Sequence, residues 1–373
     1  MSEDLAPHLP HRELIDRLRL IRSENVGPVT FRNLVAQFGD AGAAVEALPE
    51  LARRGGRKRP IKICAKAAAE REAARIAELG IQVLALDTPA YPPALAAIED
   101  APPLLFTRGH PHLLERPAVA LVGARNASAN GRRTARELAA ALAGHGQLVV
   151  SGLARGIDTA AHEGALADGT AAILAGGVDV IYPPENTDLY HAIAERGVVL
   201  AENPPGMTPQ ARHFPQRNRL ISGLVRGVVV VEAALRSGSL ITARLAGEQG
   251  REVMAVPGSP ADARAAGCNR LIKQGAALIE TAADALAALE SAHLPTAEED
   301  PRAGLQPAGP PSEDLVAEAR EVVAELLAPS PTPVDEILRE CHFSPAVVTT
   351  VLLELELAGR CERHPGNRVS LLA

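Results

Sequence analysis

Runs of apolar residues alternate with amphipathic segments through the middle of the chain. The apolar runs predict strands at residues 118–123, 147–151, 170–175, 198–201, 228–232 and 252–256. The segments between them have helical spacing and predict helices near residues 130–145, 157–167, 187–195, 217–224, 238–250 and 268–275. Continuously apolar strands that alternate with helices are typical of a parallel sheet covered on both faces. Ligands bind such sheets beyond the carboxyl ends of the strands, so the turns after these strands are the candidate functional positions.

The N-terminal part has a different, helical pattern. Residues 1–85 predict a small helical domain in which short helices flank the turn Asn25-Val26-Gly27-Pro28, and a strand at residues 82–86. This helix–turn–helix is weakly similar to a helix-hairpin-helix, a motif that binds the DNA backbone through its turn amides; a purely structural helical domain is the alternative. Residues 53–66 are basic and predict a solvated loop.

The central domain is predicted at residues 86–290, with a proline-punctuated connector at residues 91–106. Residues 291–314 are rich in Pro, Ala and acids and predict a linker. Residues 315–373 predict three helices and a hairpin, the pattern of a winged helix. Its expected recognition helix, residues 344–354, contains no Lys or Arg. We therefore expect this domain to bind protein, its own chain, or DNA only weakly.

The charge is unevenly distributed. The net charge of the 373 residues is −7, but residues 298–373 hold 14 acids and 6 Lys or Arg, whereas residues 1–297 hold 31 acids and 32 Lys or Arg. The total therefore does not exclude a nucleic-acid surface on the rest of the chain. Four widely spaced cysteines argue against disulfides or a zinc site and favour a reducing compartment, the cytoplasm. We expect no secretory signal, membrane span, metal or cofactor.

A local positive surface is predicted around the strand at residues 228–232. Between Pro204 and Val231 the chain has four arginines, Arg212, Arg217, Arg219 and Arg226, and no acid. Arg217, Asn218 and Arg219 are expected to begin a helix. After the strand, Ser237-Gly238-Ser239 opens another helix, and backbone amides at a helix N-terminus can hold an anion. This stretch predicts half of a phosphate-binding groove.

Turns after two other predicted strands offer the other half. Gly123 and Arg125 follow the first strand, where glycine admits a phosphate to the backbone and arginine can bind its oxygens. A tight structural turn is an equal alternative. No G-x-G-x-x-G is present, so this is no nicotinamide site. After the second strand come Gly152 and Arg155. Phe214 could stack on a base or serve as a packing anchor.

Asp158 and His162 are four residues apart on one predicted helix, so an acid–base pair is conceivable. We favour structural roles, with Asp158 capping the helix and His162 packed in the core or bonded to a neighbouring loop, because no nucleophile with a motif accompanies them. No catalytic residue is therefore predicted.

Together these motifs resemble the DNA-processing protein DprA (Smf) family. The resemblance rests on V-G-A-R (122–125), S-G-L-A-R-G-I-D-T-A-A-H (151–162), L-A-G-G-V-D-V-I-Y-P-P-E-N (174–186), H-F-P-Q-R-N-R-L-I-S-G-L (213–224) and V-V-V-V-E-A-A-L-R-S-G-S-L-I-T-A (228–243), with further matches at 91–109, 250–258 and 267–276. It implies an α/β fold: an extended Rossmann-like parallel-sheet domain flanked by an N-terminal helical domain and a C-terminal winged-helix domain.

The family's implied function is to bind single-stranded DNA without strong sequence preference and to load the RecA recombinase onto it, displacing single-strand-binding protein, during natural transformation. It implies a homodimer formed through the Rossmann-like domain, and no enzyme. Carried over by position, the family's pocket arginine is Arg125 and its arginine pair is Arg217 and Arg219, with Arg212 for a further basic residue. The family Ser is Ala124 here, and Pro184-Glu185 stand where some relatives have Lys. The alternative is a Rossmann-type nucleotide phosphoribohydrolase, although the catalytic Glu expected after the glycines is missing.

Overall fold

The computed structural model describes residues 9–291, 312–364 and 366–372. They form two compact units. The sheet unit contains residues 75–98 and 104–291, and the helical unit contains residues 9–74, 99–103 and 312–372. The segments predicted as separate N-terminal and C-terminal domains thus contribute to one unit. Most of the predicted linker, residues 291–314, lies outside the described residues.

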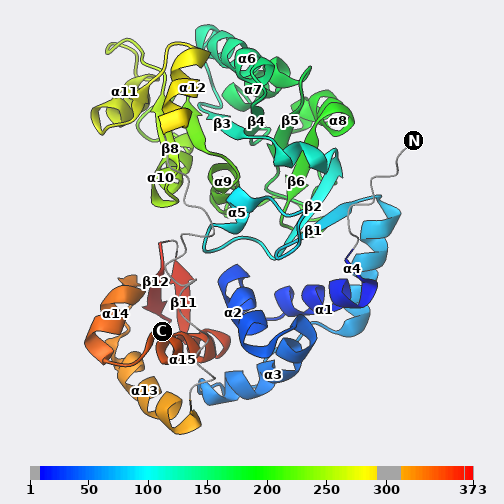
Figure 1. The fold of residues 1–373 in the computed structure, drawn as a ribbon, viewed down its shortest axis with the longest axis vertical. Coiled ribbons are helices and arrows are strands. Elements are labelled where there is room, and N and C mark those ends of the chain that lie inside the picture. Colours follow the sequence, from blue (N-terminus) through cyan, green and yellow to red (C-terminus); the bar gives the residue numbers. More distant parts are fainter. Residues whose placement is uncertain (1–8, 292–311, 365, 373) are drawn as a thin grey trace. The chain divides into compact units, whose positions relative to one another are not determined.

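A mixed nine-stranded sheet is the centre of the sheet unit, within the part of the chain that the structure describes (Figure 1). Its order is β1-β2-β6-β5-β4-β3-β7-β8-β9. The strands are β1 (Gln82–Ala85), β2 (Leu104–Gly109), β3 (Ala118–Val122), β4 (Leu148–Ser151), β5 (Thr170–Ile173), β6 (Val198–Ala201), β7 (Gly227–Val230), β8 (Glu252–Ala255) and β9 (Ala277–Leu278). The six strands predicted for the central domain are confirmed and pair in parallel.

One edge of the sheet differs from the prediction. The second half of the expected connector at residues 91–106 is β2, which pairs antiparallel with both β1 and β6. Pro102-Pro103 suggested a loop, but they precede the strand, where a missing N–H interrupts no ladder. Leu105 and Phe106 are fully buried. Because β1 is paired in this sheet, the sheet unit begins before the predicted boundary at residue 86.

The helices of the sheet unit cover both faces of the sheet. They are α5 (Pro93–Ala96), α6 (Ala129–Gly144), α7 (Ile157–Ala165), α8 (Thr187–Arg196), α9 (His213–Gly223), α10 (Ser239–Glu248), α11 (Ala266–Lys273) and α12 (Ala282–Ser291). In Figure 1, α6 and α7 lie on one side of β3 and β4, and α9 and α10 lie on the other. The sequence pattern did not predict α12 or the two-residue β9.

The chain leaves β3 and β7, which are neighbours, in opposite directions. The crossover through α6 places β4 on one side of β3, whereas the crossover through α10 places β8 on the other side of β7. This reversal of strand order is a topological switch point, where a crevice opens at the carboxyl ends of the strands and ligands bind. The loops after β3 and β7 are therefore the first place to search for a site.

The helical unit contains helices from both ends of the chain. Its elements are α1 (His11–Ile21), α2 (Pro28–Phe38), α3 (Ala41–Arg54), most of α4 (Lys66–Glu78), α13 (Glu313–Leu326), α14 (Val334–Cys341), α15 (Pro345–Leu357), β10 (Thr332–Pro333), β11 (Cys361–His364) and β12 (Arg368–Leu371). Helices α13–α15 with the sheet β10-β12-β11 confirm the predicted winged helix. Among the described residues no helix combines the length and apolarity that a membrane span requires.

Candidate nucleic-acid interface

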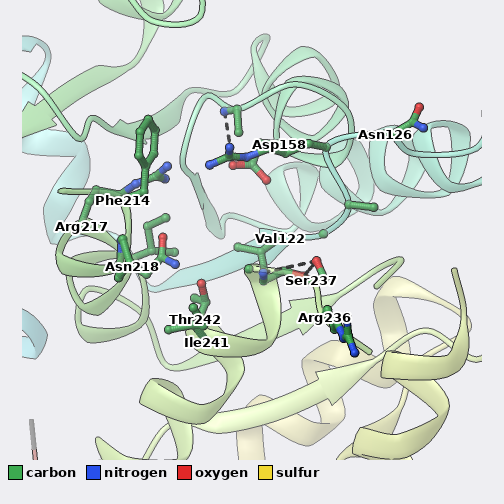
Figure 2. Close-up of a pocket in the computed structure, with 18 of the residues that line it drawn as sticks. Val122, Asn126, Asp158, Phe214, Arg217, Asn218, Arg236, Ser237, Ile241 and Thr242 are labelled. Atoms are coloured by element: carbon green, nitrogen blue, oxygen red, sulfur yellow. Dashed lines mark hydrogen bonds between the residues drawn. The ribbon is translucent and has the colours of Figure 1, made fainter. Parts of the chain in front are cut away.

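A cavity of about 940 Å³ lies at the switch point of the sheet (Figure 2). One wall is the loop after β3, residues 122–126, and a second is the loop after β7 with the start of α10, residues 234–242. The third wall is one face of α9. The sequence-predicted residues that line this cavity are Gly123, Arg125, Phe214, Arg217, Asn218, Ser237, Gly238 and Ser239.

Helix α9 begins at His213, four residues before the expected start at Arg217. Pro215 lies in the first turn, where a helix needs no donor from its backbone. The earlier start places Phe214, Arg217 and Asn218 at positions i, i+3 and i+4, on one face of the helix. That face lines the cavity, whereas Arg219 lies on another face.

Arg217 is buried against the backbone of Gly152. The side chain is 5% exposed, and a Cβ atom added to Gly152 would lie 1.4 Å from Arg217 Nη1. Any larger residue would therefore displace the guanidinium group. Gly152 itself is not among the residues that line the cavity. We infer that it contributes to the site by leaving space for Arg217.

Asp158 lies beside Arg217 and is the one carboxylate lining the cavity among the described residues. Its Oδ2 accepts hydrogen bonds from the amides of Gly152 at 3.1 Å and Ala154 at 3.4 Å. Burial raises the pKa of Asp158, and the charge of Arg217 opposes that rise. Burial also lowers the pKa of Arg217 to about 10, with Asp158 opposing, so the arginine stays protonated at neutral pH. Asp158 thus bonds to the loop before α7, not to the first turn of the helix as expected.

His162 is a core residue. Its Nδ1 lies 2.9 Å from Thr170 Oγ1, and Thr170 donates its own proton to Val149 O, so Nδ1 carries the hydrogen. Burial lowers the pKa of His162 to about 3, so the ring is neutral. This arrangement agrees with the expected structural role.

Three side chains form a stack beside the cavity. The guanidinium carbon of Arg125 lies 5.0 Å from the ring centroid of Phe214, within the range of a cation–π contact. The ring of Tyr182 contacts that of Phe214 with 5.6 Å between centroids and an angle of 57° between the ring planes. Tyr182 is 46% exposed and lines the cavity, although it is not among the site residues predicted from the sequence. Its position in the turn that follows a predicted strand was the available signal.

The start of α10 supplies hydroxyl groups and further arginines. Ser237 Oγ and Ser239 Oγ lie 2.8 Å apart, and Gly238 is the N-cap residue. Arg236 and Arg264 also line the cavity and are exposed, although Arg264 is paired with Asp262 at 3.0 Å. The sequence did not predict either arginine as a site residue, because both lie outside the arginine-rich stretch between Pro204 and Val231.

Three predicted arginines do not line the cavity. Arg219 is nearly buried and forms an ion pair with Glu202. Arg155 is exposed and paired with Glu185 at 2.7 Å. Arg212 is exposed, and its Nε donates to His213 Nε2 at 3.3 Å. Arg219 therefore does not join Arg125 and Arg217 at this cavity, because helical positions two residues apart, such as 217 and 219, lie on different faces of the helix.

Comparison with known proteins identifies the family of this chain. The sequence matches the family description "DNA recombination-mediator protein A" over residues 82–290, "DprA-like N-terminal HHH domain" over residues 11–74, and "DprA winged helix domain" over residues 306–367. This chain belongs to the DprA family. The DNA processing protein DprA of Streptococcus pneumoniae is 48% identical over 202 residues, which are 54% of this chain and 71% of that protein. Protein Smf of Escherichia coli is 42% identical over 290 residues, 76% of each chain.

Solved DprA structures have the same fold. The X-ray structure of the Streptococcus pneumoniae protein matches with a TM-score of 0.59 and 37% identity, covering 73% of this chain and 96% of that one. A structure of DNA processing protein A from Helicobacter pylori, described for its single-stranded DNA binding mode, matches with a TM-score of 0.52 and 31% identity over 57% of this chain and 98% of that one. The fold predicted from the sequence is thus the fold of the DprA family.

Proposed function

We propose that this protein binds single-stranded DNA in the cavity between α9, the loop after β3 and the start of α10. The observation that carries the proposal is the convergence of Arg125 and Arg217 on a cavity whose one carboxylate, among the described residues, is already bonded to two amides. Two guanidinium groups and a single carboxylate, which is already hydrogen-bonded, give the cavity a net positive charge that favours phosphate binding. The single-stranded DNA binding named for the Helicobacter pylori relative supports the same ligand.

Binding through phosphates and stacking carries little sequence information, so we expect weak sequence preference. The stack of Tyr182, Phe214 and Arg125 offers every base a planar surface. We further propose that the protein loads RecA onto the bound strand and displaces single-strand-binding protein in the cytoplasm, as a homodimer formed through the Rossmann-like sheet unit. The recombination-mediator description of the family supports a recombinase partner. Neither RecA loading nor strand binding needs a catalytic residue, so we propose no enzymatic activity.

The test is a salt titration of binding to labelled single-stranded oligonucleotides of different sequence. Each phosphate contact on a single strand contributes about 0.7 to the slope of log K against log salt. We expect the Arg125→Ala/Arg217→Ala variant to lose most of its affinity and to reduce the slope by about 1.4. Arg133→Ala, at an exposed position of α6, is the matched charge control. An unchanged slope in the double variant would place the DNA elsewhere.

RecA loading is tested separately, by following RecA filament formation on strands coated with single-strand-binding protein. We expect the parent protein to shorten the lag and the double variant to leave it unchanged. If the double variant still shortened the lag, loading would not depend on this cavity.

A further inference from the structure

The helix α15 is covered by protein on two faces. Val347, Val351 and Leu355 pack into the core of the winged helix. Leu353 and Leu357, one turn apart, belong instead to the core formed by helices α1–α3, where they join Phe31, Leu48 and other buried residues. In a helix-turn-helix fold the equivalent helix enters the major groove of duplex DNA. Here the C-terminal half of α15 contacts the N-terminal helices of the same chain.

The contact includes the backbone of both partners. A Cβ atom added to Gly55, the residue after α3, would lie 2.0 Å from the carbonyl oxygen of Glu354. Asn25 Nδ2 donates to the carbonyl oxygen of Leu357 at 3.3 Å. Arg360 Nη1 donates to Gly55 O at 3.5 Å. The turn between α1 and α2, the expected DNA-binding turn of a helix-hairpin-helix, therefore contacts the end of α15.

The two partners also carry opposite charge. Residues 53–66 hold seven Lys or Arg and no acid, whereas residues 313–372 hold eleven acids and five Lys or Arg. Arg54 Nη2 donates to Glu313 Oε1 at 2.5 Å, which joins the basic segment to the winged helix. Lys58, Arg59 and Lys62 are exposed. An acidic domain beside these side chains would repel the phosphates of a nucleic acid that approached them.

We propose that this face of α15 is a protein-docking surface whose occupant is the N-terminal helical domain of the same chain. The docked winged helix withholds residues 53–66 and the turn at Asn25 from duplex nucleic acid. The helical unit thus holds a second, masked polyanion-binding surface, distinct from the single-strand site in the sheet unit. When the contact opens, the acidic domain moves away from Lys58, Arg59 and Lys62, which are already exposed, and their positive charge attracts duplex phosphates.

The test uses the full chain in the Arg125→Ala/Arg217→Ala background, so that the single-strand site contributes little. Gly55→Ala is the opening variant, because the backbone of Gly55 has an ordinary negative φ of −67° and the added methyl group meets only the α15 contact. Leu353→Ala opens the contact by a second route. Gly144→Ala, where a Cβ atom would meet nothing within 4 Å, is the matched control.

Two measurements are made on each variant: hydrogen exchange of the amides of residues 353–358 and affinity for a duplex oligonucleotide at low salt. We expect both opening variants to exchange faster and to bind duplex DNA at least about tenfold more tightly than the background, and Lys58→Ala/Arg59→Ala/Lys62→Ala to remove the gain. Faster exchange without a gain in duplex affinity would overturn the masking. Unchanged exchange in both variants would show that α15 is an integral part of the core and not a docked surface.

Discussion

Helix α9 lines the cavity proposed to bind DNA, and α15 occupies the recognition-helix position of a winged helix; the two differ in what covers them. α9 presents Phe214, Arg217 and Asn218 to a cavity at the switch point of a parallel sheet. α15 carries no Lys or Arg and buries two faces against its own chain. The comparison shows that the fold determines where a helix is placed, whereas the side chains on the outward face of the helix determine whether it binds nucleic acid or protein.

The largest expected effect separates two arginines of α9. Arg217→Ala should weaken single-strand binding by about tenfold to a hundredfold, because a hydrogen bond to a charged group contributes about 1.5–3 kcal/mol. Arg219→Ala should change affinity by less than about threefold but lower the melting temperature, because it leaves Glu202 nearly buried without its cation. Anisotropy titrations and thermal unfolding of both variants check this. Equal losses of affinity in Arg217→Ala and Arg219→Ala would mean that Arg219 also contacts the single-stranded DNA.

The next prediction concerns the space beside Gly152, which the guanidinium group of Arg217 occupies. Gly152→Ala places a methyl group where the guanidinium lies, so we expect about a tenfold loss of single-strand affinity without the loss of any charge. Gly144→Ala is the control, since its added methyl group meets open space. The measurement is the same titration, made on protein whose circular dichroism matches the parent. Parent-like affinity in Gly152→Ala would show that the buried position of Arg217 is not needed.

A smaller effect is expected from the aromatic stack. Tyr182→Ala should lower affinity about fivefold to tenfold, the lower end of the roughly 1–3 kcal/mol that stacking of one base contributes, because Phe214 and Arg125 remain in place. Tyr182→Phe keeps the ring and should bind like the parent. Abasic oligonucleotides sharpen the test, because Tyr182→Ala should not weaken their binding further. If it did, the ring would act through packing against Phe214.

The last effect is on stability rather than on strand binding, and it distinguishes the two units by pH. His162 has its pKa lowered from 6.5 to about 3, so the unfolded chain binds the proton more readily between these values. The contribution of His162 to the free energy of unfolding is complete above pH 6.5. It decreases by about 1.4 kcal/mol for each pH unit as the pH falls toward 3. Glu354 and Glu356 of the helical unit have the opposite sign, since burial raises their pKa and their ionisation costs stability as the pH rises.

Unfolding of the parent and of His162→Gln, followed over this pH range, isolates the histidine contribution, with His145→Gln on the exposed end of α6 as control. The stability difference between parent and His162→Gln should shrink on acidification, whereas His145→Gln should follow the parent. A pH-independent difference would mean that His162 is protonated in the folded protein.

Much of the cavity could be predicted from the sequence, because its walls are turns that follow apolar strands. Gly123, Arg125, Ser237 and Ser239 were found in this way. Arg219 was grouped with Arg217 because the two are close in sequence, but in α9 they are two positions apart and lie on different faces of the helix. Tyr182 and Arg264 were missed although each lies in a loop that follows a strand, because both lie outside the arginine-rich stretch between Pro204 and Val231.

The sequence alone determined the α/β core, the winged helix and the positive stretch near α9, because apolar periodicity and charge are local properties of a chain. The tertiary structure alone decided that Arg217 rests on Gly152, that Arg219 pairs with Glu202, and that α15 packs against the N-terminal helices. Each of these depends on contacts between residues that are distant in sequence, which local patterns do not determine.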